Sequence, residues 1–251
     1  MPKLIVLGTS DAVPDENHDN THLLLLGEKR RVLIDAASNP VMRLRRLNVE
    51  PNSITDIIMT HFHPDHVSGI PLLLMNMWLL GRDQLLNIYG LEHCVRLMEQ
   101  FLDAFEWSRW LEYPVEIKRL RDMKMTPVLE SDEFRITSFP VQHFVPTIGL
   151  RIEFPQSGKV LAYTSDTAPT ANVVWLAKGA DILLHEAAGA SAGHSSAAQA
   201  GEMATQAGVK ELYLIHYPTG KFDSESLVAE AKQNFDGPVA LAQDFMEFSF
   251  D

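Results

Sequence analysis

The sequence predicts an α/β fold in which stacked β-sheets lie between helices. Three observations predict it. Strand-like segments dominate the first third, strands and helices then alternate, and no repeat, low-complexity segment or long linker divides the 251 residues. This length suits one large domain or two small ones and is ample for a sizeable core. Because no long linker divides the chain, we assign residues 1–251 to a single domain.

The first third is expected to form strands and turns. Residues 4–7 are an apolar run that ends at Gly8, and residues 22–26 and 31–34 flank a Gly-Glu-Lys turn typical of a hairpin. Residues 40–47 are expected to form a short helix. Residues 56–60 form a short apolar strand that leads directly into a polar loop rich in histidine.

Strands and helices alternate along the rest of the chain. Residues 91–101 have the pattern of an amphipathic helix, and residues 196–207 form an alanine-rich helix closed by Gly208. Two further helices are expected over 172–177 and 224–234. The expected strands are 86–89, 115–120, 134–139, 148–154, 160–163, 182–184, 212–215 and 239–242.

Composition excludes several classes of protein. The 46% hydrophobic content rules out global disorder, and 33 acidic against 21 basic side chains, a net charge of −12, disfavour broad attraction to nucleic acid or anionic membranes. The single cysteine, Cys94, excludes a disulfide framework and a multi-cysteine zinc site, and is expected to be buried in its helix. With neither a secretion signal nor an apolar run long enough to span a bilayer, a cytoplasmic location is expected and no membrane association.

The loop after residue 60 has the composition of a metal site. His61 and His63 can point the same way from an extended segment, and Asp65 and His66 follow where the chain turns. Four possible ligands within six residues are not explained by core packing. Histidine together with aspartate suits borderline divalent metals such as zinc, manganese or iron(II).

Three more candidate ligands occupy the same kind of position. His143, Asp166 and His216 each follow an apolar strand, and strand ends on one edge of a sheet are where α/β folds place their sites. Taken singly, each could be a surface or capping residue. Together with the first cluster they supply five histidines and two aspartates, enough for two metals that share one carboxylate.

At this point the sequence resembles the metallo-β-lactamase superfamily. The resemblance rests on the His-x-His-x-Asp-His spacing at residues 61–66 and on the later His143, Asp166 and His216. Four further segments resemble the ribonuclease Z and phosphodiesterase branch. Residues 8–14 resemble its opening turn, and residues 242–246 resemble its C-terminal strand. Residues 185–188 resemble its His-Glu-Ala segment, and residues 193–196 resemble its Gly-His-Ser-Thr segment. The resemblance implies an αββα sandwich, in which two mixed β-sheets are flanked by helices, with a dinuclear centre at the sheet edge.

The resemblance also implies a role for each residue. The first metal would take His61, His63 and His143, the second would take Asp65, His66 and His216, and Asp166 would bridge the two. The ions, with zinc favoured over Mn²⁺ or Fe²⁺, would activate a shared water. His194 with Glu186 would form a proton-donating pair, which together with Asp65 makes up the catalytic set; the alternative for His194 is a polar cap on the helix that follows.

Other polar residues near these motifs receive structural roles. Asp35 resembles the family's aspartate that orients ligands from beneath the site, and Thr60 is expected to assist it. His185 should face away from Glu186 along the same strand. The remaining histidines, which have no ligand spacing, are expected to be surface or packing residues: His18, His22 and His93.

The region between the first ligand cluster and His143 bears on the substrate. Ribonuclease Z carries a glycine-rich, basic arm there that clamps tRNA, whereas residues 67–142 contain no such arm. Aromatic and methionine residues within 71–113 suggest a hydrophobic wall near the metals or a dimer surface, or else core helices. A small anionic ester or phosphodiester is therefore favoured over RNA as the substrate, and a homodimer is a possible assembly.

Four functions remain to be separated. The leading prediction is a dinuclear metal-dependent phosphodiesterase that resembles ribonuclease Z. The alternatives are a carboxylic ester or lactone hydrolase, a tRNA 3′-processing endoribonuclease, and a metal-binding accessory protein without catalytic activity.

Overall fold

Two seven-stranded sheets form the centre of the computed structural model, which describes residues 2–220 and 224–251. In spatial order the first sheet contains β14 (Glu247–Ser249), β1 (Lys3–Gly8), β2 (His22–Leu26), β3 (Arg31–Ile34), β4 (Asp56–Ile58), β5 (Leu86–Leu91) and β6 (Val115–Leu120). The second contains β13 (Val239–Leu241), β12 (Glu211–Ile215), β11 (Ile182–Glu186), β10 (Lys159–Tyr163), β9 (Thr147–Phe154), β8 (Arg135–Val141) and β7 (Thr126–Glu130).

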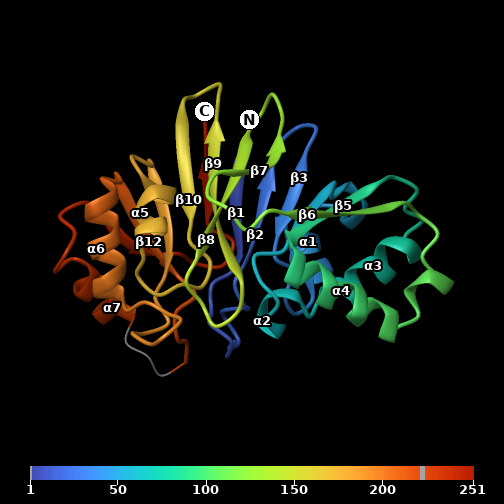
Figure 1. The fold of residues 1–251 in the computed structure, drawn as a ribbon, viewed down its shortest axis with the longest axis horizontal. Helices are drawn as coiled ribbons and strands as arrows, with labels where there is room; N and C mark the ends of the chain where they lie inside the picture. The colour runs from blue at the N-terminus through green and yellow to red at the C-terminus, as the bar shows by residue number, and fades with distance from the viewer. Residues whose placement is uncertain (1, 221–223) are drawn as a thin grey trace.

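Helices cover the two outer faces and complete a four-layer sandwich (Figure 1). The first sheet carries α1 (Pro40–Arg46), α3 (Ile70–Leu79) and α4 (Glu92–Ala104), with the 3₁₀ turns η1 (Pro51–Ser53) and η2 (Trp107–Arg109). The second sheet carries α5 (Ala171–Ala177), α6 (Ala197–Ala207) and α7 (Ser224–Ala231), while the short α2 (Pro64–Val67) lies at the lower edge in Figure 1. The predicted α/β sandwich is confirmed.

The leucine run of β2 shows why the sequence folds into layers. Successive side chains of a strand point to opposite faces, so Leu23 and Leu25 enter the core between the sheets while Leu24 packs toward the helices. All three are fully buried. An uninterrupted apolar strand is therefore the expected sequence for the middle of a sandwich with helices outside. Phe154 and Phe250 stack in the same inner core, with ring centroids 3.8 Å apart.

Strand direction brings the carboxyl ends of many strands to one edge. Strands β3, β4, β5 and β6 are mutually parallel, as are β10, β11, β12 and β13. Strand β8 runs in the same direction as β10, since both are antiparallel to β9. The loops that follow β4, β8, β10 and β12 therefore have the opportunity to meet at this edge.

Most predicted elements are present, with ends shifted by at most three residues. Strand β7 was not predicted, because it contains Pro127 and its register with β8 breaks between Pro127 and Leu129. Proline lacks a backbone N–H, and β7 is accordingly an edge strand. Every helix among the described residues falls short of the length and hydrophobicity that a membrane span needs.

The expectation of a strand over residues 242–246 is wrong. This segment is a turn between β13 and β14, and Phe245 adopts the left-handed conformation with φ of 69°. The backbone of Val6 exchanges hydrogen bonds with Phe245 and Met246, and the guanidinium groups of Arg43 and Arg46 lie 4.1 and 4.8 Å from the Phe245 ring centroid. Those contacts hold the turn, and the last strand, β14, begins after it at Glu247.

Candidate metal centre

The first ligand cluster is placed by the end of β4 and the start of α2. His63 is the extended residue before the helix, with φ of −96° and ψ of 151°, and Pro64 opens the first turn. His61 and His63 therefore project from the same extended segment, with ring centroids 4.7 Å apart. Asp65 and His66 lie within the helix and are directed to a neighbouring position. The chain turn separates the four side chains into two pairs.

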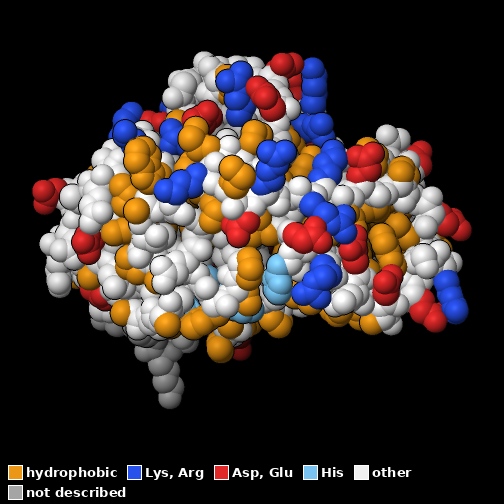
Figure 2. Space-filling model, in the orientation of Figure 1, with side chains coloured by type: hydrophobic (Ala, Val, Ile, Leu, Met, Phe, Trp, Pro, Cys, Tyr) orange, Lys and Arg blue, Asp and Glu red, His pale blue; other side chains and the backbone are white. Residues whose placement is uncertain are grey.

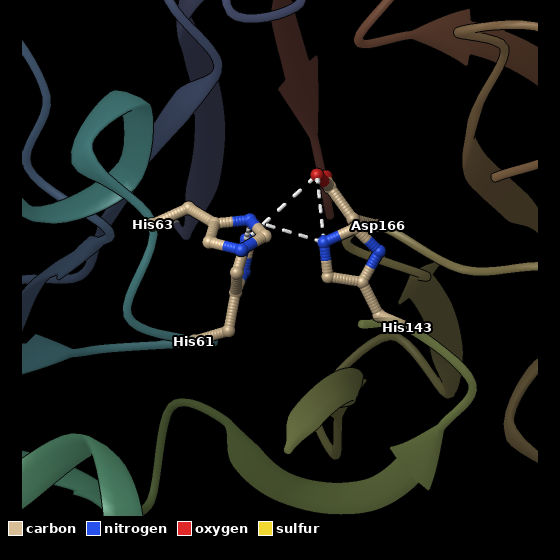
Figure 3. Close-up of side chains that lie close together, drawn as sticks. All are labelled: His61, His63, His143 and Asp166. Atoms are coloured by element: carbon tan, nitrogen blue, oxygen red, sulfur yellow. Dashed lines mark hydrogen bonds and ion pairs between the residues drawn. The ribbon is translucent and has the colours of Figure 1, made fainter. Parts of the chain in front are cut away.

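Three loops of the second sheet meet this cluster. His143 follows β8, Asp166 follows β10 and His216 follows β12, and Figure 3 shows His143 and Asp166 facing His61 and His63. The structure forms two groups whose donor atoms all lie within 4.8 Å of one another. One contains His61, His63, His143 and Asp166, and the other contains Asp65, His66, Asp166 and His216. Asp166 belongs to both groups.

The sharp turns after β10 and β12 help to aim these side chains. Ser165, immediately before Asp166, has φ of 53°, and His216 itself has φ of 50°. Both values lie in the left-handed region, which is uncommon for residues other than glycine. Such strain persists where surrounding contacts over-determine it, and it concentrates at functional sites. Here it occurs at Ser165, directly before the shared carboxylate of Asp166, and at the candidate ligand His216.

The donor chemistry fits divalent cations. His66 donates from Nδ1 to Asp35 at 2.8 Å, which leaves its buried Nε2 without a hydrogen-bond partner 3.4 Å from Oδ1 of Asp166. Oδ1 of Asp166 is equally buried and unpartnered. Two acceptor atoms facing each other in a buried site cost free energy unless a cation lies between them. The His/Asp cluster in this fold therefore indicates a site for divalent metal.

The other group of donors converges in the same way. Nε2 of His61 and Nε2 of His143 each lie 3.1 Å from Nδ1 of His63. His61 donates from Nδ1 to the Thr60 hydroxyl, and His143 donates from Nδ1 to the carbonyl of Gly193 at 2.7 Å. Each of these contacts assigns the ring proton to the outer nitrogen and leaves a lone pair facing the centre.

Burial and charge act in opposite directions on the pKa values. Burial lowers the pKa of His61 and of His143, which keeps both rings neutral, as metal ligands must be. Burial also opposes charge on His66 and His216, but the Asp166 carboxylate outweighs it and raises the pKa of both. Burial would raise the pKa of Asp166, yet His216 and His66 hold it well below its usual range. The site thus favours positive charge around Asp166.

Asp35 supports the centre from below, as predicted. It is fully buried at the end of β3 and accepts hydrogen bonds at 2.8 Å from the Thr60 amide, the Thr60 hydroxyl and Nδ1 of His66. Ser165 extends this network, because its hydroxyl donates to that of Thr60 at 2.9 Å. The network joins β3, β4 and the loop after β10, and it orients residues from both ligand groups.

Glu186 and His194 form a pair beside the ligands. Nδ1 of His194 donates to Oε1 of Glu186 at 2.9 Å, and the His194 ring lies 4.8 Å from that of His143 and 6.0 Å from that of His216. Burial opposes charge on His194, but the hydrogen bond to Glu186 and its charge raise the pKa. Burial raises the pKa of Glu186, and the donated hydrogen bond from His194 opposes that effect.

The capping alternative for His194 does not hold. The helix α6 is capped by Ser196, whose side chain accepts from the Gln199 amide in a capping box. Among the other histidines, His185 is buried and its Nδ1 contacts the carbonyl oxygen of Glu186, while His22 is buried and contacts the carbonyl oxygen of Asn20. These are packing positions, as predicted.

Sequence reasoning missed the contacts that Gly193 and Ser165 make, although Gly193 lies in the segment 193–196 that carries the resemblance. Gly193 orients His143 through a backbone carbonyl, which has no signature in the sequence. A side chain at this position would also meet His143, since a Cβ would lie 2.9 Å from its Nδ1. The Ser165 hydroxyl was hidden for a similar reason: its partner, Thr60, is 105 residues away in the chain.

The aromatic segment 71–113 mostly serves the core. Its tryptophans, Trp78, Trp107 and Trp110, are partly buried against the cluster beneath the helices. A small apolar cavity of about 170 Å³ remains between α3 and α4. Phe101 lines it, and its ring lies 6.4 Å from that of Phe62, which is located between His61 and His63. Core helices thus account for most of the segment, and one apolar pocket opens near the metal loop.

The fold and the site together define a metallohydrolase class: two stacked sheets between helices, with a histidine- and aspartate-rich centre at one edge. A comparison with protein families matches residues 30–217 to the Beta-lactamase superfamily domain. The chain belongs to this superfamily. The predicted family resemblance is confirmed, and relatives named ribonuclease Z support the predicted branch.

Relatives and solved structures agree with this assignment. A ribonuclease Z of Methanothermobacter thermautotrophicus is 29% identical, and the match covers 98% of this chain and 96% of that protein. The metallo-beta-lactamase fold protein YhfI from Bacillus subtilis shares the fold with a TM-score of 0.84 at 24% identity, with 98% of each chain covered. Short-form human tRNase Z gives 0.80 at 23% identity, with 99% of each covered. The predicted class of enzyme, a metal-dependent hydrolase acting on ester bonds, is confirmed by this set of relatives.

Proposed function

We propose that this chain is a phosphodiesterase that uses two divalent ions, with Zn²⁺ favoured and Mn²⁺ or Fe²⁺ as alternatives. The observation that carries the proposal is the pair of ligand groups that share Asp166, with His194 beside both. The five imidazoles suit zinc. One ion would be held by His61, His63, His143 and Asp166, and the other by Asp65, His66, His216 and Asp166.

The side chains of the site have separable roles in this reaction. Divalent ions bound here supply Lewis acidity, which lowers the pKa of water and offsets negative charge on phosphate oxygens. His194 engages Glu186 through Nδ1, so the proton on its Nε2 is available for the oxygen that leaves. Asp65, whose side chain is 14% exposed, would accept a hydrogen bond from the attacking water.

Hydrolysis of bis(p-nitrophenyl) phosphate tests the proposal. The purified protein should contain close to two divalent ions per chain, and His66→Ala should lose both turnover and roughly half of the metal. His93→Ala is the matched control, because His93 lies on α4 outside both ligand groups. Circular dichroism would show that the His66 variant is folded. Turnover by metal-free protein would exclude the proposal.

A tRNA 3′-processing endoribonuclease is the second candidate, favoured by the relatives named ribonuclease Z. One feature of the match opposes it. The alignment with the M. thermautotrophicus protein runs over 307 positions, whereas 98% of this 251-residue chain is about 246 residues. About 60 alignment positions thus have no residue of this chain, and a chain without a tRNA-binding arm would align in this way. Specific removal of a 3′ trailer from a pre-tRNA, faster than cleavage of a small diester, would favour this candidate.

The remaining alternatives are separated by one substrate panel. A carboxylic ester or lactone hydrolase would prefer p-nitrophenyl esters or lactones over phosphodiesters. A metal-binding accessory protein would hold its metal and turn over no member of the panel. The phosphodiesterase proposal requires diesters to be the preferred class, with a small anionic diester as the substrate.

Three further properties belong to the proposal. Residues 1–251 are taken as one domain, which limited proteolysis would test through the absence of a stable fragment. The cytoplasm is the proposed compartment, in keeping with a single cysteine. A homodimer is the proposed assembly, which sedimentation or light scattering would measure.

A further inference from the structure

An exposed aromatic ring lies beside the proposed active site. Phe144 directly follows His143 and is 62% exposed, although most large hydrophobic residues of the chain are buried. Its ring centroid lies 5.0 Å from that of His143 and 5.9 Å from that of His194. Isolated exposed hydrophobic residues are ordinary on protein surfaces. Phe144 differs because it touches one proposed metal ligand and the proposed proton donor at once.

The ring of Phe144 is held in place rather than free. Both histidines meet it edge to face, at interplanar angles of 61° and 64°. Gly193 also packs against the ring. A Cβ at this position would lie 2.8 Å from Cε2 of Phe144, so only glycine allows the backbone to come this close to the Phe144 ring. Nδ1 of His143 also donates to the Gly193 carbonyl, which ties the two loops together. The outward part of the ring remains open to solvent.

The position of Phe144 indicates which part of a substrate would reach it. His194 is the proposed donor to the leaving oxygen, and its side chain is 22% exposed. A group attached to that oxygen would lie beside the ring of His194, which is next to His143, and Phe144 borders both rings. Resting on the proposed function, we infer that Phe144 is a stacking platform for a planar ring next to the scissile bond, so the preferred substrates are phosphodiesters with an aromatic or heteroaromatic substituent.

The physical basis is the interaction between flat ring systems. A planar ring can stack on the exposed side of Phe144 with offset geometry, whereas a saturated ring of similar size gains area burial alone. Because the platform is already fixed by Gly193 and two histidines, binding orders few additional side chains. Stacking also tolerates different rings, since it requires a π-face rather than a particular hydrogen-bond pattern.

Two non-hydrolysable ligands test this inference on the metal-loaded protein. Benzylphosphonate and cyclohexylmethylphosphonate carry the same phosphonate group and the same number of carbons, but only the first has a flat ring. Calorimetric titration should show tighter binding of benzylphosphonate. Phe144→Ala should weaken that binding on the order of five- to tenfold and weaken cyclohexylmethylphosphonate binding by a smaller factor, because only area burial is lost there. Phe144→Tyr should retain the preference.

Matched variants locate the effect. Trp175→Ala removes another exposed aromatic ring, 55% exposed on α5 against Lys178, and should leave both affinities unchanged. Phe105→Ala removes an exposed ring that lines the apolar cavity. Loss of the benzyl preference in the Phe105 variant, equal binding of the two ligands, or no detectable binding of either would overturn the inference. Because the readout is affinity, it is independent of whether diesters are hydrolysed.

Discussion

Replacement of Asp35 by asparagine should weaken metal binding without changing any proposed ligand. Asp35 lies at φ of 61°, a conformation that asparagine also tolerates, so the backbone should be preserved. One carboxylate oxygen accepts from both the Thr60 hydroxyl and Nδ1 of His66. In Asp35→Asn an NH₂ group can occupy this place, and it would face two donors.

The magnitude follows from those contacts. To relieve the conflict, His66 must move or shift its proton to Nε2, the nitrogen proposed to bind metal. Loss of such an outer partner typically weakens metal affinity 10- to 100-fold, or about 1.4–2.7 kcal/mol. The group that contains His66 should lose this affinity, and the group with His61, His63 and His143 should lose less. A buried donor left without a partner should also lower the free energy of unfolding by about 1–3 kcal/mol.

Titration of metal-free protein with Zn²⁺, in competition with a chromophoric chelator, measures the two affinities separately. Asp56→Asn is the matched control, because Asp56 is an equally buried carboxylate at the other end of the parallel pair β3 and β4. Its partners lie outside the ligand groups, so stability should fall while metal affinity stays unchanged: they are Arg30, Thr55, Asn87 and Tyr89. Unchanged affinities in the Asp35 variant, or equal losses in the control, would refute the reasoning.

Three further predictions follow from the same structure. Glu186→Gln should lower the raised pKa of His194. Because His194 can donate a proton only below that pKa, the basic limb of the pH profile of kcat/KM should move to lower pH for a diester with an alkyl leaving group. An unmoved limb would contradict the assignment of His194 as the proton donor. Removal of metal by a chelator should lower the Tm by about 5–10 °C, because metal at 100 times its Kd adds about 2.7 kcal/mol to the free energy of unfolding. Scanning calorimetry with and without added Zn²⁺ would measure this shift, and an unchanged Tm would count against a bound ion. Gly201→Ala should lower the free energy of unfolding, measured in urea, by at least about 2 kcal/mol, because a Cβ would lie 2.2 Å from the Ala231 carbonyl oxygen. Gly90→Ala should lower it by less, because the nearest atom, 3.0 Å away, is the end of the flexible Met59 side chain.

Local patterns predicted most of the elements and failed where tertiary contacts act on the backbone. The leucine run of β2 predicts a strand in any context, because both of its faces can be buried. Strand β7 was missed, since Pro127 argues against pairing, yet an edge position accommodates it. The turn at Phe245 is held by Val6, Arg43 and Arg46, residues roughly 200 or more positions away, and no local pattern reports such contacts.

The sequence by itself determined the chemistry of the candidate centre. Histidine and aspartate spaced as in residues 61–66 suit divalent metal, and ligand types at the ends of apolar strands indicate the edge of a sheet. Spacing in the chain cannot report distance between separate strands. The pairing of β10, β11 and β12 within one sheet brought Asp166 within 3.2 Å of His216, and the packing of the two sheets brought it within 3.4 Å of His66.

The tertiary structure alone also decided the surroundings of that centre. It placed the Gly193 carbonyl against His143, and it exposed Phe144, whereas six other phenylalanines are buried. The physical reason is that every residue has a backbone carbonyl, so the sequence does not indicate which carbonyl will accept a hydrogen bond from a ligand. The identity of an aromatic residue likewise does not indicate which part of the surface it will occupy. Their roles come from which loops the parallel strands deliver to the same edge.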